Sequence, residues 1–82
     1  MEEFDKAAED IKNYNLDNTQ KLELYGLYKQ AKFGNCNTQK PGWFDNTVNR
    51  YKWDKWNSFK GMKKEEAMRK YIRIVDKYRN KK

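Results

Sequence analysis

The feature that most constrains the fold is the spacing of the apolar residues, which recur three and four positions apart in successive segments. This is the spacing of an amphipathic helix, and no segment alternates between apolar and polar residues as a strand does. The pattern predicts helices over about residues 3–14, 17–33 and 47–60, and from near residue 63 onward. The first and last apolar stripes are Phe4, Ala7, Ala8 and Ile11, and Met68, Tyr71, Ile72 and Val75. We therefore expect an all-α protein, a four-helix bundle.

Local signals predict where the second and third helices begin and end. Asp17 followed by Gln20 is typical of a capping box, which would start the second helix. Gly34 and Gly61 would end the second and third helices, because glycine is favoured just after a helical C-terminus. Between these helices, residues 34–46 contain the only proline and predict a long loop. Trp43 and Phe44 are expected to hold this loop against the body of the protein.

Composition limits the chemistry. Eighty-two residues make one domain, and we expect residues 1–82 to form it. The chain has no histidine and one cysteine, Cys36, which excludes a Cys/His zinc site and leaves acid–base and nucleophilic catalysis poorly served. A lone cysteine also indicates a reducing compartment. We therefore expect a protein that is not an enzyme and needs no cofactor.

Charge is unevenly distributed along the chain. Residues 1–17 carry a formal charge of −4 and residues 18–82 carry +11, within a total of +7. The later part should therefore meet an anionic partner, which could be a nucleic acid, an anionic membrane or a phosphorylated small molecule. No signal peptide or apolar run of membrane-spanning length is visible. We expect a cytoplasmic monomer without stable membrane insertion.

The second helix carries apolar residues on two faces. Leu24, Leu27, Tyr28 and Ala31 form one stripe, while Leu22, Tyr25 and Lys29 lie beside it. Tyr25, Tyr28 and Lys29 stand at i, i+3 and i+4, so one part of the helix surface can present two phenols and an ammonium group together. Aromatic faces suit a nucleotide base, and lysine suits a phosphate.

Several ordered motifs resemble the acyl-CoA-binding protein family over almost the whole chain. They are Phe4 to Ala8, Leu24 to Ala31, Gly34 to Thr38 with Pro41-Gly42, Lys52 to Asn57, Lys60-Gly61, Lys64 to Met68, and Tyr71-Ile72. The resemblance implies the four-helix bundle of this family, with its long loop between helices 2 and 3. It also implies a carrier and pool former for medium- to long-chain acyl-CoA esters such as palmitoyl-CoA or myristoyl-CoA.

The resemblance further implies which residues contact the ligand. Those that would contact the nucleotide are Lys12, Tyr25, Tyr28, Lys29, Lys52 and Tyr71. Among them, Tyr25, Lys29 and Lys52 would gather around the 3′-phosphate, Tyr28 would stack on the adenine, and Tyr71 would close the site. Those that would line the acyl groove or let the chain approach closely are Phe4, Ala7, Ala8 and Leu22.

The chain departs from the family pattern in two relevant places. One extra residue precedes Lys52, and Lys21 stands where an aliphatic contact to the acyl chain is common. We expect these differences to adjust the chain-length preference. The alternative function is a basic helical module that binds nucleic acid through residues 18–82. Transient contacts with acyl-CoA-using enzymes would accompany the carrier function.

Overall fold

The computed structural model describes residues 2–80 and contains four α-helices. They are α1 (Glu2–Asp10), α2 (Asn18–Phe33), α3 (Thr47–Ser58) and α4 (Lys64–Arg79), with a short 3₁₀ helix, η1 (Ile11–Asn13), after α1. Residues 2–80 form no strand, so the predicted all-α class and the four-helix arrangement are confirmed. The lysines at 81 and 82, predicted to extend the basic last helix, lie outside the described residues. Within the described part, no helix is both long and apolar enough to span a membrane.

Helix ends follow from specific side chains. Asp17 caps α2 as predicted: its Oδ1 accepts the backbone N–H of Gln20 at 2.8 Å, and the Gln20 side chain accepts the N–H of Asp17 at 3.1 Å. Gly34 and Gly61 have φ values of 78° and 93°, a left-handed conformation that glycine adopts without a steric penalty. The first helix is shorter than predicted, because the chain tightens into η1 at Ile11.

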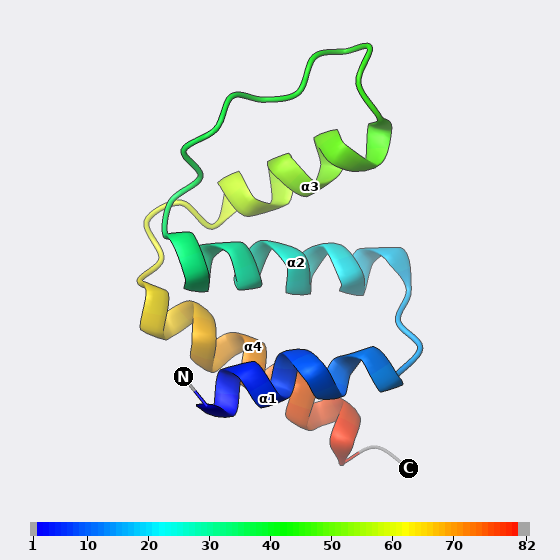
Figure 1. The fold of residues 1–82 in the computed structure, drawn as a ribbon, viewed down its shortest axis with the longest axis vertical. Coiled ribbons are helices and arrows are strands. Elements are labelled where there is room, and N and C mark those ends of the chain that lie inside the picture. The colour runs from blue at the N-terminus through cyan, green and yellow to red at the C-terminus, as the bar shows by residue number, and fades with distance from the viewer. Residues whose placement is uncertain (1, 81–82) are drawn as a thin grey trace.

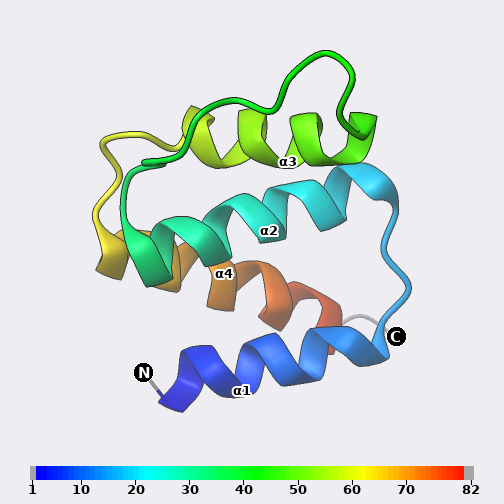
Figure 2. The same ribbon diagram turned by 45° about the horizontal axis from the view of Figure 1, so that its top comes forward.

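The helices lie in the order α1, α4, α2, α3 across the molecule (Figures 1 and 2). Helix α2 packs against α4 on one side and against α3 on the other, while α1 packs against α4. This explains why the apolar residues of α2 occupy two faces. It also leaves α3 and the loop before it on the far side of α2 from α1 (Figure 2).

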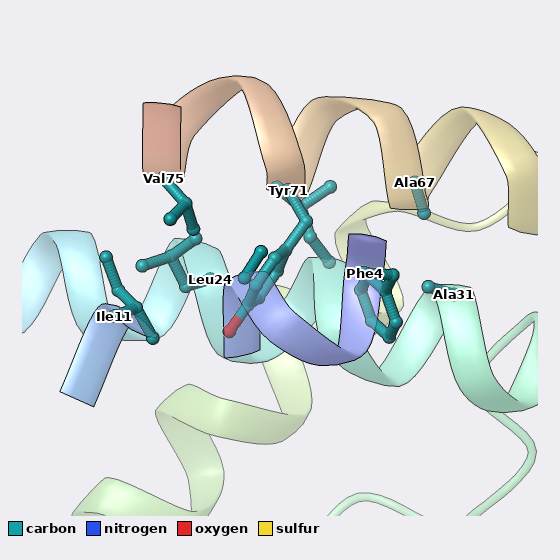
Figure 3. Packing of buried hydrophobic residues seen from close by; sticks show 9 residues of the cluster. Phe4, Ile11, Leu24, Ala31, Ala67, Tyr71 and Val75 are labelled. Carbon is teal, nitrogen blue, oxygen red and sulfur yellow. The ribbon is translucent and has the colours of Figure 1, made fainter. Parts of the chain in front are cut away.

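The hydrophobic core lies where α1, α2 and α4 meet (Figure 3). Phe4 is fully buried, and its ring lies 5.4 Å from that of Tyr28 and 5.1 Å from that of Tyr71, centroid to centroid. The other buried members are Ala7, Ile11, Leu24, Leu27, Ala31, Ala67 and Val75. Aromatic contacts of this kind add to the stabilisation from buried area. The core therefore fixes the positions of Tyr28 and Tyr71, two of the predicted ligand contacts.

The loop over residues 34–46 is held by groups other than those predicted. The indole N–H groups of Trp53 and Trp56 donate to the backbone oxygens of Thr38 and Gly34, both at 2.9 Å. Lys40 also forms an ion pair with a carboxylate of α3, the Nζ–Oδ1 distance to Asp54 being 3.2 Å. The loop thus runs alongside α3 (Figure 1).

The prediction that Trp43 and Phe44 hold the loop against the body is wrong. Their side chains are 83% and 82% exposed. They lie in the turn that precedes α3, and their rings contact each other in a T-shaped arrangement with centroids 5.9 Å apart. Because the indoles of α3 already bind the loop backbone, these two side chains are left to project from it.

Candidate ligand-binding site

Tyr25 lies where three surface pockets meet. A pocket of about 460 Å³ lies between η1, α2 and α4, a pocket of about 440 Å³ lies between the first halves of α2 and α3, and a third of about 290 Å³ lies beneath the loop. Tyr25 lines all three, and Lys52 lines the second and third. The first two fall within the size range of small-molecule sites. One extended ligand could therefore occupy all three pockets and contact Tyr25 in each of them.

The first pocket is aromatic with a cationic edge. The four tyrosines in its lining are Tyr14, Tyr25, Tyr28 and Tyr71, and its cations are Lys12 and Lys21. Burial raises the pKa of the Tyr71 phenol, and the neighbouring Tyr28 raises it further. Both effects keep the hydroxyl of Tyr71 protonated. The pocket thus offers flat aromatic surface and neutral hydroxyl donors to a heteroaromatic ring with a phosphate attached.

Two ammonium groups lie close to the Tyr25 ring. Lys29 Nζ is 5.7 Å from its centroid, and it also lies 4.9 Å from that of Phe33 and 5.5 Å from that of Trp56. Lys52 Nζ approaches the Tyr25 ring from α3 at 5.3 Å. Neither ammonium takes part in any of the ion pairs among residues 2–80. Two cations that lie over aromatic rings and form no ion pair with a carboxylate make a site suited to a phosphate, although Asp45 lines the same pocket.

Burial also acts on Tyr25 itself. It raises the pKa of the phenol, and the nearby Cys36 thiol adds to the effect. The hydroxyl therefore stays a neutral hydrogen-bond donor beside the two ammonium groups. Donor and charges together complement an anion.

The second pocket is the most apolar of the three and was only partly predicted. Leu22, a predicted groove residue, lines it together with Val48 and Tyr51 of α3, and Lys21 and Lys52 also line it. The sequence contained a signal for the missed pair, because Val48, Tyr51 and Lys52 stand at i, i+3 and i+4 and so share one helix face. An apolar channel with cations beside it suits an alkyl chain attached to a charged head group.

The predicted site residues fall into two groups in the structure. The six predicted nucleotide contacts all line the first or third pocket: Lys12, Tyr25, Tyr28, Lys29, Lys52 and Tyr71. Of these, Lys12 is paired with Glu9 at 3.2 Å on an exposed surface. Among the predicted groove residues, only Leu22 lines one of the three pockets.

Phe4, Ala7 and Ala8 lie elsewhere. Phe4 and Ala7 are fully buried in the core, and Ala8 is half-buried against it. The amphipathic stripe in the first helix therefore packs against α4 and α2. Phe4, Ala7 and Ala8 line none of the three pockets around Tyr25, whereas Ile11, at the end of the stripe, lines the first. The small size of Ala7 serves this close packing.

Comparison with known proteins agrees with the geometry. The family model described as "Acyl CoA binding protein" matches residues 1–75. An acyl-CoA-binding domain-containing protein 2 from Oryza sativa subsp. japonica is 51% identical over 77 residues, covering 92% of this chain and 84% of that protein. An acyl-CoA-binding protein from Gossypium hirsutum is 49% identical over 76 residues, covering 90% and 84%.

Solved structures show the same fold. The crystal structure of Oryza sativa acyl-CoA-binding protein 2 superposes with a TM-score of 0.87 at 49% identity, over 93% of this chain and 86% of that one. The acyl-CoA-binding protein of Moniliophthora perniciosa gives a TM-score of 0.81 at 31% identity, over 98% and 83%. The fold and the aromatic, cationic site are those of a small helical protein of the ligand-binding class. The chain belongs to the acyl-CoA-binding protein family.

Proposed function

We propose that this protein binds medium- to long-chain acyl-CoA esters one to one and serves as an intracellular carrier and pool former for them. The observation that carries the proposal is the position of Tyr25, which three pockets share and which two unpaired ammonium groups flank. Family membership supports acyl-CoA as the ligand. It gives no support to the alternative of a nucleic-acid-binding module.

The nucleotide half of the ligand would occupy the pockets on either side of Tyr25. Lys29 and Lys52 would bind the 3′-phosphate with the Tyr25 hydroxyl, because these three groups converge from α2 and α3. Tyr28 would stack on the adenine, and Tyr71 would close the first pocket from α4. Stacking of a base on an aromatic side chain contributes about 1–3 kcal/mol. On this assignment Lys12 would turn from Glu9 toward the nucleotide.

The acyl half would lie in the apolar pocket between α2 and α3. Leu22, Val48 and Tyr51 supply its apolar surface. Each buried methylene contributes about 0.8 kcal/mol, so a dozen contribute on the order of 10 kcal/mol before the cost of ordering the chain. Lys21 lines the same pocket, and its ammonium group would hold the charged head group of the ligand near the rim while the alkyl chain lies inside. Chain length should therefore affect affinity strongly.

The proposed role in the cell follows from that burial. A bound ester would be withdrawn from micelles and carried as a monomeric complex to acyl-CoA-using enzymes in the cytoplasm. Contacts with those enzymes would be transient. Residues 1–82 would suffice for binding as a single domain and a monomer, with no metal and no further cofactor.

Calorimetric titration with palmitoyl-CoA tests the proposal, with palmitate, free CoA and a DNA oligonucleotide as comparisons. We expect one-to-one binding of the ester, much weaker binding of CoA and of palmitate alone, and no binding of DNA beyond a salt-sensitive background. Absence of heat with every acyl-CoA, together with tight binding of the oligonucleotide, would contradict it.

A further inference from the structure

The turn before α3 exposes an unusual amount of aromatic surface. Trp43 and Phe44 are the most exposed of the large hydrophobic residues described, at 83% and 82%. Val48 and Tyr51, on the first turns of α3, are also more than half exposed. We call Trp43 and Phe44 the aromatic tip. Exposed apolar patches on a protein surface often mark an interaction site.

Backbone and side-chain hydrogen bonds define the turn that carries the aromatic tip. The N–H of Asp45 donates to the backbone oxygen of Gly42 at 2.9 Å, and a methyl group at Gly42 would lie 3.1 Å from the Phe44 ring. Asn46 caps α3 by accepting the N–H of Val48 at 2.7 Å. The two rings are thus carried at the start of a helix, and their T-shaped contact fixes them relative to each other.

The charges near the aromatic tip are arranged so that cations prevail. Over residues 40–55 the chain holds four cations and two anions, a net charge of +2. One anion, Asp45, is turned into the helix start, where its Oδ1 accepts from the Asn46 N–H at 2.6 Å and from the Asn49 amide at 3.3 Å. The other, Asp54, is paired with Lys40. A negatively charged surface approaching the tip therefore meets more positive than negative charge, and Arg50 takes part in none of the ion pairs among residues 2–80.

We propose that the aromatic tip docks onto the surface of an anionic lipid bilayer. The tip is exposed and carries a tryptophan, whose ring is apolar while its N–H is polar, and such side chains favour the interface between head groups and acyl chains. Basic residues beside apolar ones are the pattern by which proteins lie on anionic membranes. Two rings give a shallow and reversible attachment.

The docked orientation has a consequence for the ligand. Val48 and Tyr51 line the apolar pocket between α2 and α3, so docking places the mouth of that pocket at the lipid surface. A long-chain ester could then pass between bilayer and pocket with little exposure of its acyl chain to water. This consequence rests on the proposed function, whereas the docking itself requires no ligand.

Flotation of the ligand-free protein with vesicles tests the docking. The vesicles are phosphatidylcholine with and without phosphatidylserine, and the variant carries Trp43→Ser with Phe44→Ser. We expect binding to the anionic vesicles, loss of binding at high salt, and a partition coefficient lowered roughly tenfold or more in the double variant. Phe33→Ser, which removes an exposed ring at the other end of α2, is the matched control and should keep the wild-type partition.

Three results would overturn the proposal: no binding of the wild type to anionic vesicles, equal binding by the double variant, or an equal loss in Phe33→Ser. A titration with palmitoyl-CoA in the absence of vesicles separates the tip from the ligand site. Unchanged affinity in the double variant supports docking. Lost affinity with retained vesicle binding would instead make the tip a cover for the acyl chain. If the wild type bound no acyl-CoA, the proposed function would be wrong. The vesicle experiment would still decide whether the tip docks onto a bilayer.

Discussion

Lys52 Nζ lies 5.3 Å from the centre of the Tyr25 ring, so a cation of α3 meets the face of an aromatic residue in the middle of α2. The two residues are 27 positions apart in the numbering, and the packing of α3 on α2 brings them together. Lys29 approaches the same ring from within α2. The phosphate site proposed here therefore depends on the way these two helices pack.

Tyr25→Phe removes one hydroxyl donor from this site. We expect the affinity for palmitoyl-CoA to fall about tenfold to a hundredfold, as for loss of one hydrogen bond to a charged group, with unchanged affinity for 3′-dephospho-palmitoyl-CoA. Tyr78→Phe, at a tyrosine outside the three pockets, serves as the control. Equal losses for the two esters would show that the hydroxyl does not contact the 3′-phosphate.

The burial of Tyr71 predicts a dependence of stability on pH. Burial raises the pKa of its phenol in the folded protein, so the unfolded chain loses this proton first as the pH rises past about 10. The stabilisation from this group is therefore complete below that pH and is lost as the pH rises toward the folded-state pKa. Urea denaturation should show a steeper loss of unfolding free energy above pH 10 for the wild type than for Tyr71→Phe. Identical slopes would contradict this.

Gln30 joins the end of α2 to the segment between α3 and α4. Its buried Nε2 donates to the backbone oxygen of Met62 at 2.7 Å and to the side chain of Asn35 at 3.0 Å. Gln30→Leu should lower the unfolding free energy by about 1–3 kcal/mol, because both acceptors lose a buried donor. The same substitution at exposed Gln39 should change it by less than about 0.5 kcal/mol. Equal effects in chemical denaturation would refute the role of Gln30.

The capping box of α2 predicts a smaller effect. Asp17→Ala leaves the Gln20 N–H without its acceptor and should cost about 1 kcal/mol of unfolding free energy. Glu23→Ala, on the exposed surface of the same helix, is the matched control. Thermal unfolding of the two variants would separate loss of the cap from loss of a negative charge.

Much of the fold could be predicted because its signals are local. The Asp17–Gln20 pair and Gly34 act within one helical turn, and the structure places the ends of α2 beside them. The prediction for α3 was too long, because this helix ends at Ser58, before Gly61. The two faces of α2 were also visible, since periodicity reports which residues share a side. Periodicity does not report which neighbour covers that side. The assignment of Phe4 and Ala7 to a ligand groove therefore stays a prediction, and the structure shows both side chains buried in the core between α1, α2 and α4.

The contacts of the loop over residues 34–46 could not be predicted from local sequence patterns either. An aromatic pair after Pro41-Gly42 favours burial on composition alone, but the anchoring hydrogen bonds come from the indoles of Trp53 and Trp56. Whether Trp43 and Phe44 pack against the helices or remain exposed depends on the path of the loop, which no local sequence pattern specifies. Likewise, Val48 and Tyr51 became pocket residues only through the packing of α3 on α2.

The most direct test of the central claim is calorimetry of palmitoyl-CoA and 3′-dephospho-palmitoyl-CoA with the wild type and with Lys29→Gln. The claim is that Lys29, held among three aromatic rings, binds the 3′-phosphate with Tyr25 and Lys52. We predict that removing the phosphate weakens binding to the wild type about tenfold to a hundredfold, and that the variant discriminates far less between the two esters. Equal affinity of the wild type for both esters would contradict the account.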